Sequence, residues 1–317
     1  ISGAYFGDKM SPLSDTTNLA PAVAGTDVFT HIRYLVYTTG PTFLLTLLIF
    51  GIIGIFYVNN ASEINTGFIK QGIAATFNTN LGLLFVPVLL IFLIIKKVPP
   101  IPVLLAGTVL GILFACIFQS DLLNQLLATQ HFQNKYQLLM QSVFGGMNLE
   151  TGLTEVDKLL STGGMEGMLN TVFLILTALT FGGVMDACGF LKKVTETFLK
   201  FIVNQTSLVG STLLTCIFFN ITACDQYLAI VIPGKMLQKL YQEKGLKPEV
   251  LSRALEDSAT VTSVLVPWNS CGATQAKVLG VATLDYLPYC FFNLISPLMN
   301  LLITAIHFKI RNIRPSR

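Results

Sequence analysis

An apolar run from residue 34 to residue 58 is long enough, at a helical rise of about 1.5 Å per residue, to cross the hydrocarbon core of a membrane. Further apolar runs cover residues 81–95, 103–118, 168–191 and 286–308. Hydrophobic residues make up 52% of the 317 residues and charged residues only 12%, about half the charged share of an average soluble domain. We therefore predict an all-α fold, a polytopic transmembrane helical bundle whose partner is the lipid bilayer.

The charge and cysteine content exclude several other classes of protein. A net charge of +3 is too small to indicate a nucleic-acid partner. The six cysteines lie in or beside apolar runs without any CxxC pair, which argues against a disulfide framework and against a zinc site. We expect no cofactor.

A polar run near the start of the chain cannot be an ordinary membrane helix. Residues 7–21 read GDKMSPLSDTTNLAP, where prolines remove backbone donors and short polar side chains compete for backbone hydrogen bonds. In a soluble protein such a run would be interpreted as a surface loop. Here two further polar breaks, at residues 222–226 and 256–275, interrupt apolar segments in the same way. We therefore predict broken or re-entrant helices, since irregular backbone at membrane depth must be buried in protein or line a watery cavity.

The break at 222–226 separates two apolar halves, residues 208–221 and 227–237. We expect each half to be too short to cross the membrane by itself. The pair is either one broken span or a re-entrant hairpin. With the basic tail cytoplasmic, the hairpin places the basic clusters at residues 96–97, 192–200 and 235–253 on the same inner side. This charge distribution favours the hairpin and a cytoplasmic C-terminus.

An internal repeat is suggested when the chain is compared with itself at an offset of 255 residues. Pro12 then aligns with Pro267, and Gly25 aligns with Gly280. Each copy contains a polar break with proline, a short helix, a glycine, an acidic connector and a span containing proline. The predicted topology makes the two copies inverted, and matching discontinuous helices in inverted halves indicate the midplane site of a secondary transporter.

The domain organisation is predicted to be one integral membrane domain over residues 1–317. Residues 119–167 are mostly polar and are expected to form a loop with short interfacial helices. The first residue is Ile1, and polar chemistry begins within eight residues of it. We expect the sequence to be a fragment that lacks an N-terminal portion.

The polar breaks contain the residues that could carry chemistry, because ionisable groups inside a membrane are costly and are functional candidates. Carboxylate, amide and hydroxyl oxygens are ligands for hard cations such as Na⁺; Asp15 and Asp225 are the predicted Na⁺ ligands. A buried carboxyl group can hold a proton or a cation but not both, which is sufficient for antiport. The candidate ion-binding or substrate-binding residues are Asp8, Ser11, Ser14, Asp15, Thr16, Thr17, Asn18, Asp225, Gln226, Glu256, Asp257, Asn269, Ser270, Thr274 and Gln275.

Some of these residues also have purely structural interpretations. Glu256 and Asp257 are adjacent, so they point to different sides of a helix. Lys9, beside Asp8, is interpreted as a partner in an ion pair that lowers the cost of insertion. An enzyme is not expected, since the chain has no HExxH motif and no serine with a positioned histidine. A membrane-embedded protease and a channel are weaker alternatives to a transporter.

The run at residues 7–21 closely resembles the signature of the NhaC-type Na⁺/H⁺ antiporters. Residues 225–227, 255–258 and 267–269 are similar to later motifs of that family. The resemblance implies a protein of the bacterial inner membrane that exchanges Na⁺ for H⁺ by alternating access. The same family includes antiporters of organic anions of the malate/lactate type, so an organic anion is an alternative substrate. A homodimer is left open.

Overall fold

The computed structural model describes residues 1–12, 14–58, 76–96, 100–129, 132–147, 163–200, 202–308 and 310–311, with isolated positions at 73–74, 98, 157 and 160–161. Contacts between Cα atoms divide the chain into two compact units. The first unit comprises Ile1–Asn59 and Thr171–Arg317, and the second comprises Asn60–Asn170. The described residues leave out most of the segment 59–75, much of the 148–162 stretch and the basic tail from residue 312.

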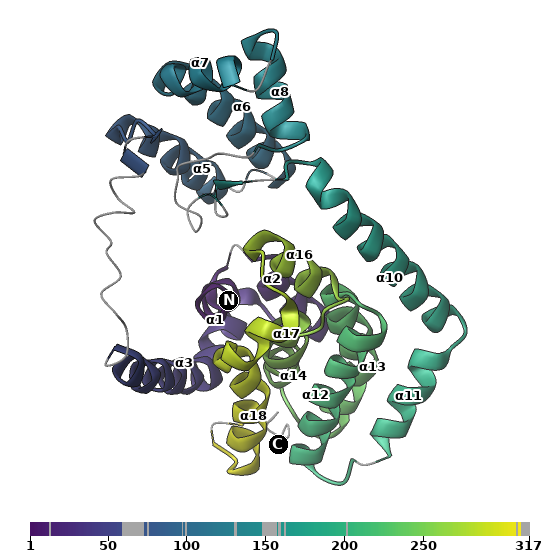
Figure 1. Cartoon of the computed structure of the whole chain (residues 1–317). Helices are drawn as coiled ribbons and strands as arrows, with labels where there is room; N and C mark the ends of the chain where they lie inside the picture. Colours follow the sequence, from purple (N-terminus) through teal and green to yellow (C-terminus); the bar gives the residue numbers. More distant parts are fainter. Residues whose placement is uncertain are drawn as a thin grey trace. The chain divides into compact units, whose positions relative to one another are not determined.

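The described residues are mostly helical and contain no β-strand, which confirms the all-α prediction. In the first unit, helices from both ends of the chain lie together around α12, α13 and α14 (Figure 1). Its elements are α1 (Ser2–Met10), α2 (Asp15–Ala24), α3 (Val28–Val58), α10 (Leu169–Ala187, entering from the second unit), α11 (Phe190–Leu199), α12 (Gln205–Thr222), α13 (Gln226–Glu243), α14 (Pro248–Leu255), the π-helical turn η3 (Glu256–Thr260), α15 (Val261–Ser263), α16 (Ser270–Leu279), α17 (Thr283–Tyr286), η4 (Leu287–Tyr289) and α18 (Phe291–Ala305).

The second unit packs α5 against α6 and α7 against α8. The predicted polar region after residue 118 contains the short helices α7 and α8, whose position at a membrane interface stays a prediction. The elements of this unit are η1 (Leu81–Leu84), α5 (Phe85–Ile95), α6 (Pro100–Phe118), α7 (Ser120–Thr129), α8 (Lys135–Phe144) and η2 (Glu166–Met168).

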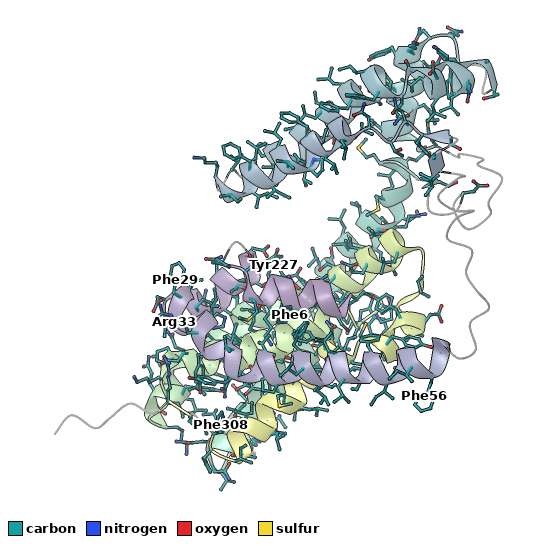
Figure 2. The ribbon with its side chains drawn as sticks, turned by 90° about the vertical axis from the view of Figure 1, so that its left-hand side faces the viewer. Phe6, Phe29, Arg33, Phe56, Tyr227 and Phe308 are labelled. Carbon is teal, nitrogen blue, oxygen red and sulfur yellow. The ribbon has the colours of Figure 1, made fainter. Side chains whose placement is uncertain are left out.

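Three of the described helical segments are long and apolar enough to cross a membrane: Val28–Tyr57, Ile101–Phe118 and Glu166–Ala187. A pair of helices, Thr283–Tyr289 and Phe291–Ala305, would supply a fourth crossing and is bent by 57° at the break between them. Phe56 lies at the opposite end of the long helix α3 from Phe29 (Figure 2). Both side chains are exposed, as lipid-facing residues would be.

The predicted polar breaks coincide with helix boundaries. The first separates α1 from α2, and the second separates α12 from α13. At the second break Cys224 adopts a left-handed backbone conformation, with φ of 61°, which is uncommon for residues other than glycine. Helices α12 and α13 pack against each other, and their re-entrant course in the membrane stays a prediction. Each helix has 18 residues. Each is longer than the apolar half predicted from the sequence, because polar residues extend both helices.

The offset of 255 residues relates helix boundaries as well as sequence features. Ser14 caps α2 and Asn269 caps α16, and each of these helices has 10 residues. Gly25 and Gly280 then end the two helices in left-handed conformations, with φ of 88° and 64°, as glycine at a helix C-terminus commonly does. The two copies therefore share local structure, and their opposite orientation in the membrane stays a prediction.

Candidate functional site

The first break brings the C-terminus of α1 against the N-terminus of α2. Ser14 caps α2 by accepting a hydrogen bond from the Thr17 backbone N–H. The Thr17 hydroxyl in turn donates to the backbone carbonyls of Asp8, at 3.0 Å, and Lys9, at 3.3 Å. These contacts satisfy backbone groups that both helix ends would otherwise leave unpaired. These contacts hold the backbone beside Thr16, the residue that precedes Thr17.

The Thr16 hydroxyl is surrounded by oxygen atoms from both ends of the chain. Its Oγ1 atom lies 3.1 Å from Ser14 Oγ and 3.5 Å from Asp8 Oδ2. It also lies 3.2 Å from Oε1 of Glu256, which is 240 residues away in sequence. Thr16 and Glu256 are fully buried, whereas Asp8 is partly exposed. We call Asp8, Ser14, Thr16 and Glu256 the oxygen cluster.

Glu256 opens the π-helical turn η3, which interrupts the helix from Pro248 to Ser263. A single π turn inside an α-helix is frequently found at functional sites. Glu256 Oε2 is buried and has no hydrogen-bond partner in the described part of the chain. The Thr260 hydroxyl, four residues further along, is likewise buried without a partner there.

Asp257 faces away from the oxygen cluster, as the adjacency of the two acidic residues predicts. It forms an ion pair with Lys9, and both side chains are fully buried. Asn300 Nδ2 donates to Asp257 Oδ2 at 2.8 Å, and Ser296 Oγ donates to Oδ1 at 3.1 Å. The sequence interpretation of Lys9 as an ion-pairing residue is correct, but its recorded partner is Asp257 rather than the adjacent Asp8.

The second break carries another carboxylate, that of Asp225. Its Oδ1 atom caps α13 by accepting hydrogen bonds from the backbone N–H groups of Tyr227 and Leu228. Its Oδ2 atom lies 3.4 Å from Ser270 Oγ, at the start of α16. The phenol of Tyr227 donates to Asp15 Oδ2. Tyr227 therefore links the second break to α2, the helix that begins at the oxygen cluster.

The third polar break is held by amide side chains. Asn269 caps α16, and its Nδ2 atom lies 3.1 Å from the backbone carbonyl of Asn220. Gln226 Oε1 accepts from Ser263 Oγ and from Cys271 Sγ, both at 3.0 Å. The structure thus brings the predicted residues of all three breaks into one connected region of the first unit.

Several other predicted residues make local contacts instead. The Ser11 backbone lies between α1 and α2. The side-chain amide of Asn18 donates to the backbone carbonyls of Pro12 and Ser14. The Thr274 hydroxyl donates to the Ser270 carbonyl within α16, and Gln275 follows it on the same helix. The roles of these residues as ion ligands stay predictions.

Sequence reasoning missed a polar stripe on α18. Ser296, Asn300 and Thr304 are buried and follow one another at intervals of four residues, so they share one helix face. Two of them hold Asp257. The four-residue spacing of polar residues within an apolar span was the signal that could have revealed this stripe.

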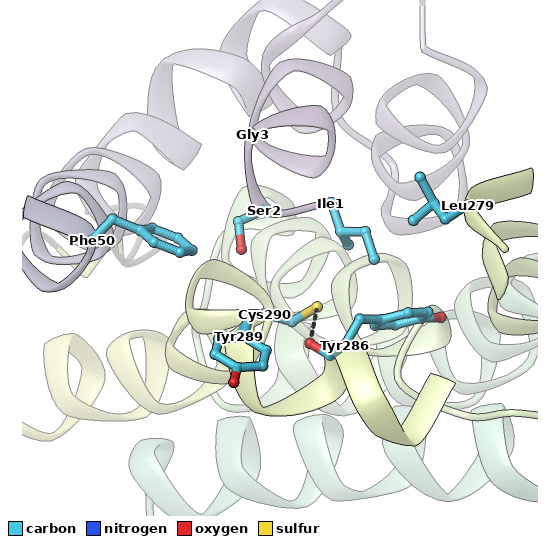
Figure 3. Close-up of a pocket in the computed structure, with 8 residues that line it drawn as sticks. All are labelled: Ile1, Ser2, Gly3, Phe50, Leu279, Tyr286, Tyr289 and Cys290. Carbon is cyan, nitrogen blue, oxygen red and sulfur yellow. Dashed lines mark hydrogen bonds between the residues drawn. The ribbon is translucent and has the colours of Figure 1, made fainter. Parts of the chain in front are cut away.

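A cavity of about 350 Å³ lies away from the oxygen cluster. It is lined by residues of α1 and α3, by Leu279 at the end of α16 and by the segment before α18, which includes Tyr289 (Figure 3). None of the predicted site residues lines it. Within the described ranges, no three histidine, cysteine, aspartate or glutamate side chains are grouped to hold a metal ion.

Apolar spanning helices, breaks at capped helix ends and buried carboxylates beside those breaks are features that multi-pass membrane transporters share. The comparison with known families agrees with that class. Residues 3–307 match the model of the Na⁺/H⁺ antiporter family, and the chain belongs to that family.

Individual relatives are similar along nearly all of the chain. The chain is 34% identical to the Na⁺/H⁺ antiporter NhaC of Alkalihalophilus pseudofirmus over 95% of its own length and 63% of that protein. It is 35% identical to NhaC of Bacillus subtilis, over 96% of the chain and 64% of the relative. It is 33% identical to the malate-2H⁺/Na⁺-lactate antiporter of Bacillus subtilis, over 93% and 61%. The chain thus spans less than two thirds of each of these relatives, and no solved structure matches it.

Proposed function

We propose that the protein containing this chain exchanges Na⁺ for H⁺ across a membrane by alternating access. One observation carries the proposal: carboxylates from two helix breaks, Asp8 and Glu256, converge on the hydroxyl of Thr16. The buried lysine nearest in sequence, Lys9, is already paired with Asp257. Asp8 and Glu256 take part in none of the ion pairs seen among the described residues. Their two carboxylates would therefore form a site for a cation or for protons.

Competition between the two ions supplies the coupling. A carboxyl group that binds a proton loses the negative charge that attracts Na⁺, so binding of one ion displaces the other. The two structural copies related by the offset of 255 residues provide the elements that would move around the site. We further propose that the copies are inverted, that the C-terminus is cytoplasmic and that the protein resides in a bacterial inner membrane. The whole chain would then act as part of one membrane domain.

The proposal is tested with the intact protein in liposomes that contain a pH-sensitive dye. A pulse of Na⁺, with no organic acid present, is expected to move protons in the direction opposite to Na⁺. A matched pulse of choline is expected to move none. The absence of proton movement with Na⁺ under any substrate condition would overturn the proposal.

The second candidate is exchange of an organic anion, supported by similarity to the malate-2H⁺/Na⁺-lactate antiporter of Bacillus subtilis. The same liposomes distinguish it from the first candidate. Proton movement that requires malate or lactate together with Na⁺ would establish the second candidate. Proton movement with Na⁺ alone would establish the first.

A further inference from the structure

We infer that the transported cation binds within the oxygen cluster, with ligands from Asp8, Ser14, Thr16 and Glu256, rather than between Asp15 and Asp225. This inference rests on the proposed function and names the site at which that function takes place. The site lies where the break between α1 and α2 meets the π-helical turn of Glu256.

The hydrogen-bonding capacity of the cluster is incomplete. Ser14 and Thr16 together have two hydroxyl protons, whereas the carboxylates of Asp8 and Glu256 have four oxygen atoms that only accept. The Thr16 hydroxyl has three oxygen atoms within 3.1–3.5 Å but can donate to only one of them. A small cation among these oxygens would interact favourably with all of them at once. Carboxylate and hydroxyl oxygens are the hard ligands that such a cation prefers.

Glu256 supplies an observation that is independent of the contacts within the cluster. Its side chain is completely buried, and Oε2 has no partner in the described part of the chain. An unsatisfied carboxylate oxygen in the interior is costly unless a ligand completes it. The Thr260 hydroxyl, also buried and unpartnered there, follows Glu256 by four residues and is available as another oxygen.

The helix ends do not determine the sign of the bound ion. The C-terminus of α1 carries partial negative charge and favours a cation, while the N-terminus of α2 carries partial positive charge and favours an anion. Both ends meet at the same break, so their effects oppose each other. The two carboxylates therefore determine the charge of the site, because the recorded ion pair of Lys9 is with Asp257.

The other carboxylates of the region are engaged elsewhere. Asp225 accepts two backbone hydrogen bonds as the cap of α13. Asp15 is exposed and accepts hydrogen bonds from the Thr16 backbone N–H and the Tyr227 phenol. These two residues are thus positioned to hold helix ends and to join the breaks.

The test is equilibrium binding of radioactive Na⁺ to the purified intact protein. Glu256→Gln and Asp8→Asn are each expected to weaken Na⁺ binding by about tenfold or more, equivalent to about 1.4 kcal/mol. The matched control is Glu249→Gln, the same substitution in the same helix at a buried carboxylate that pairs with Arg311. This control is expected to bind Na⁺ within about twofold of the original protein.

Two substitutions of Thr16, an uncharged residue, distinguish the loss of a ligand from misfolding. Thr16→Ser keeps the hydroxyl and is expected to retain Na⁺ affinity, whereas Thr16→Val removes the hydroxyl and is expected to lose affinity. Unchanged Na⁺ affinity in Glu256→Gln and Asp8→Asn, with loss in the Asp15→Asn variant, would overturn the inference and leave the proposed function intact. Failure of the unsubstituted protein both to bind Na⁺ and to move protons would instead overturn the proposed function.

Discussion

The buried ion pair between Lys9 and Asp257 gives the sharpest prediction about stability. Replacing Lys9 with methionine keeps most of the apolar part of the side chain but removes the ammonium group, so that Asp257 keeps only its contacts to Ser296 and Asn300. Both members of the pair are fully buried. Removal of one member of such a pair typically costs about 3–5 kcal/mol, because an uncompensated charge remains in the interior.

A second substitution identifies the source of this cost. The double variant Lys9→Met, Asp257→Asn removes both charges and retains an oxygen that can accept from Asn300. It is expected to recover about 2–3 kcal/mol of the loss, since no unpaired charge remains. Lys193→Met is the matched control, because the pair of Lys193 with Glu196 is exposed and 3.9 Å long. This control should cost no more than about 0.5 kcal/mol.

Thermal unfolding of the detergent-purified protein measures these differences. A thiol-reactive dye reports unfolding, because Cys216 and Cys290 are buried in the folded chain. A loss of 3–5 kcal/mol should lower the apparent melting temperature by on the order of 10 °C. A Lys9→Met variant as stable as Lys193→Met, or a double variant less stable than Lys9→Met alone, would contradict a large cost for the unpaired buried charge.

Two further predictions concern the backbone near the second and third breaks. A Cβ atom at Gly182 would lie 2.7 Å from the Ala223 carbonyl oxygen, so Gly182→Ala should cost about 1–3 kcal/mol in the same unfolding assay. Gly183→Ala has open space around it and should be neutral or slightly stabilising; equal losses at the two glycines would contradict the packing. Asn269→Ala removes the cap of α16 and the contact with Asn220, and should cost about 2–4 kcal/mol. Asn269→Asp keeps the capping oxygen, so its stability should lie between that of the original protein and that of Asn269→Ala. An Asp variant as unstable as the Ala variant would show that the cap contributes little.

The helix breaks could be predicted from the sequence because local chemistry determines them. Prolines, short polar side chains and glycines restrict the backbone at the positions where they occur. The breaks predicted from composition contain Ser14 and Asn269, which the structure shows as helix caps, and the aligned glycines Gly25 and Gly280 end the two helices. The repeat was recognisable for the same reason, since both copies use the same local devices.

The partners of the buried charges could not be predicted in this way. Lys9 and Asp257 are 248 residues apart, and only tertiary packing decides that they meet. The sequence indicated that Glu256 and Asp257 face different sides, but not which one faces the first break. That choice depends on the π-helical turn, which has no sequence signature in this chain. For this reason the sequence directed attention to Asp15 and Asp225, whereas the geometry favours Asp8 and Glu256 as ligands.

The dependence of the apparent Na⁺ affinity on pH tests directly whether Na⁺ and protons compete for the carboxylates beside the helix breaks. In liposomes containing the intact protein, the Na⁺ concentration for half-maximal exchange should rise as the pH falls, by up to about tenfold per pH unit when one proton competes. A half-maximal concentration that does not change with pH, while only the maximal rate changes, would contradict the account.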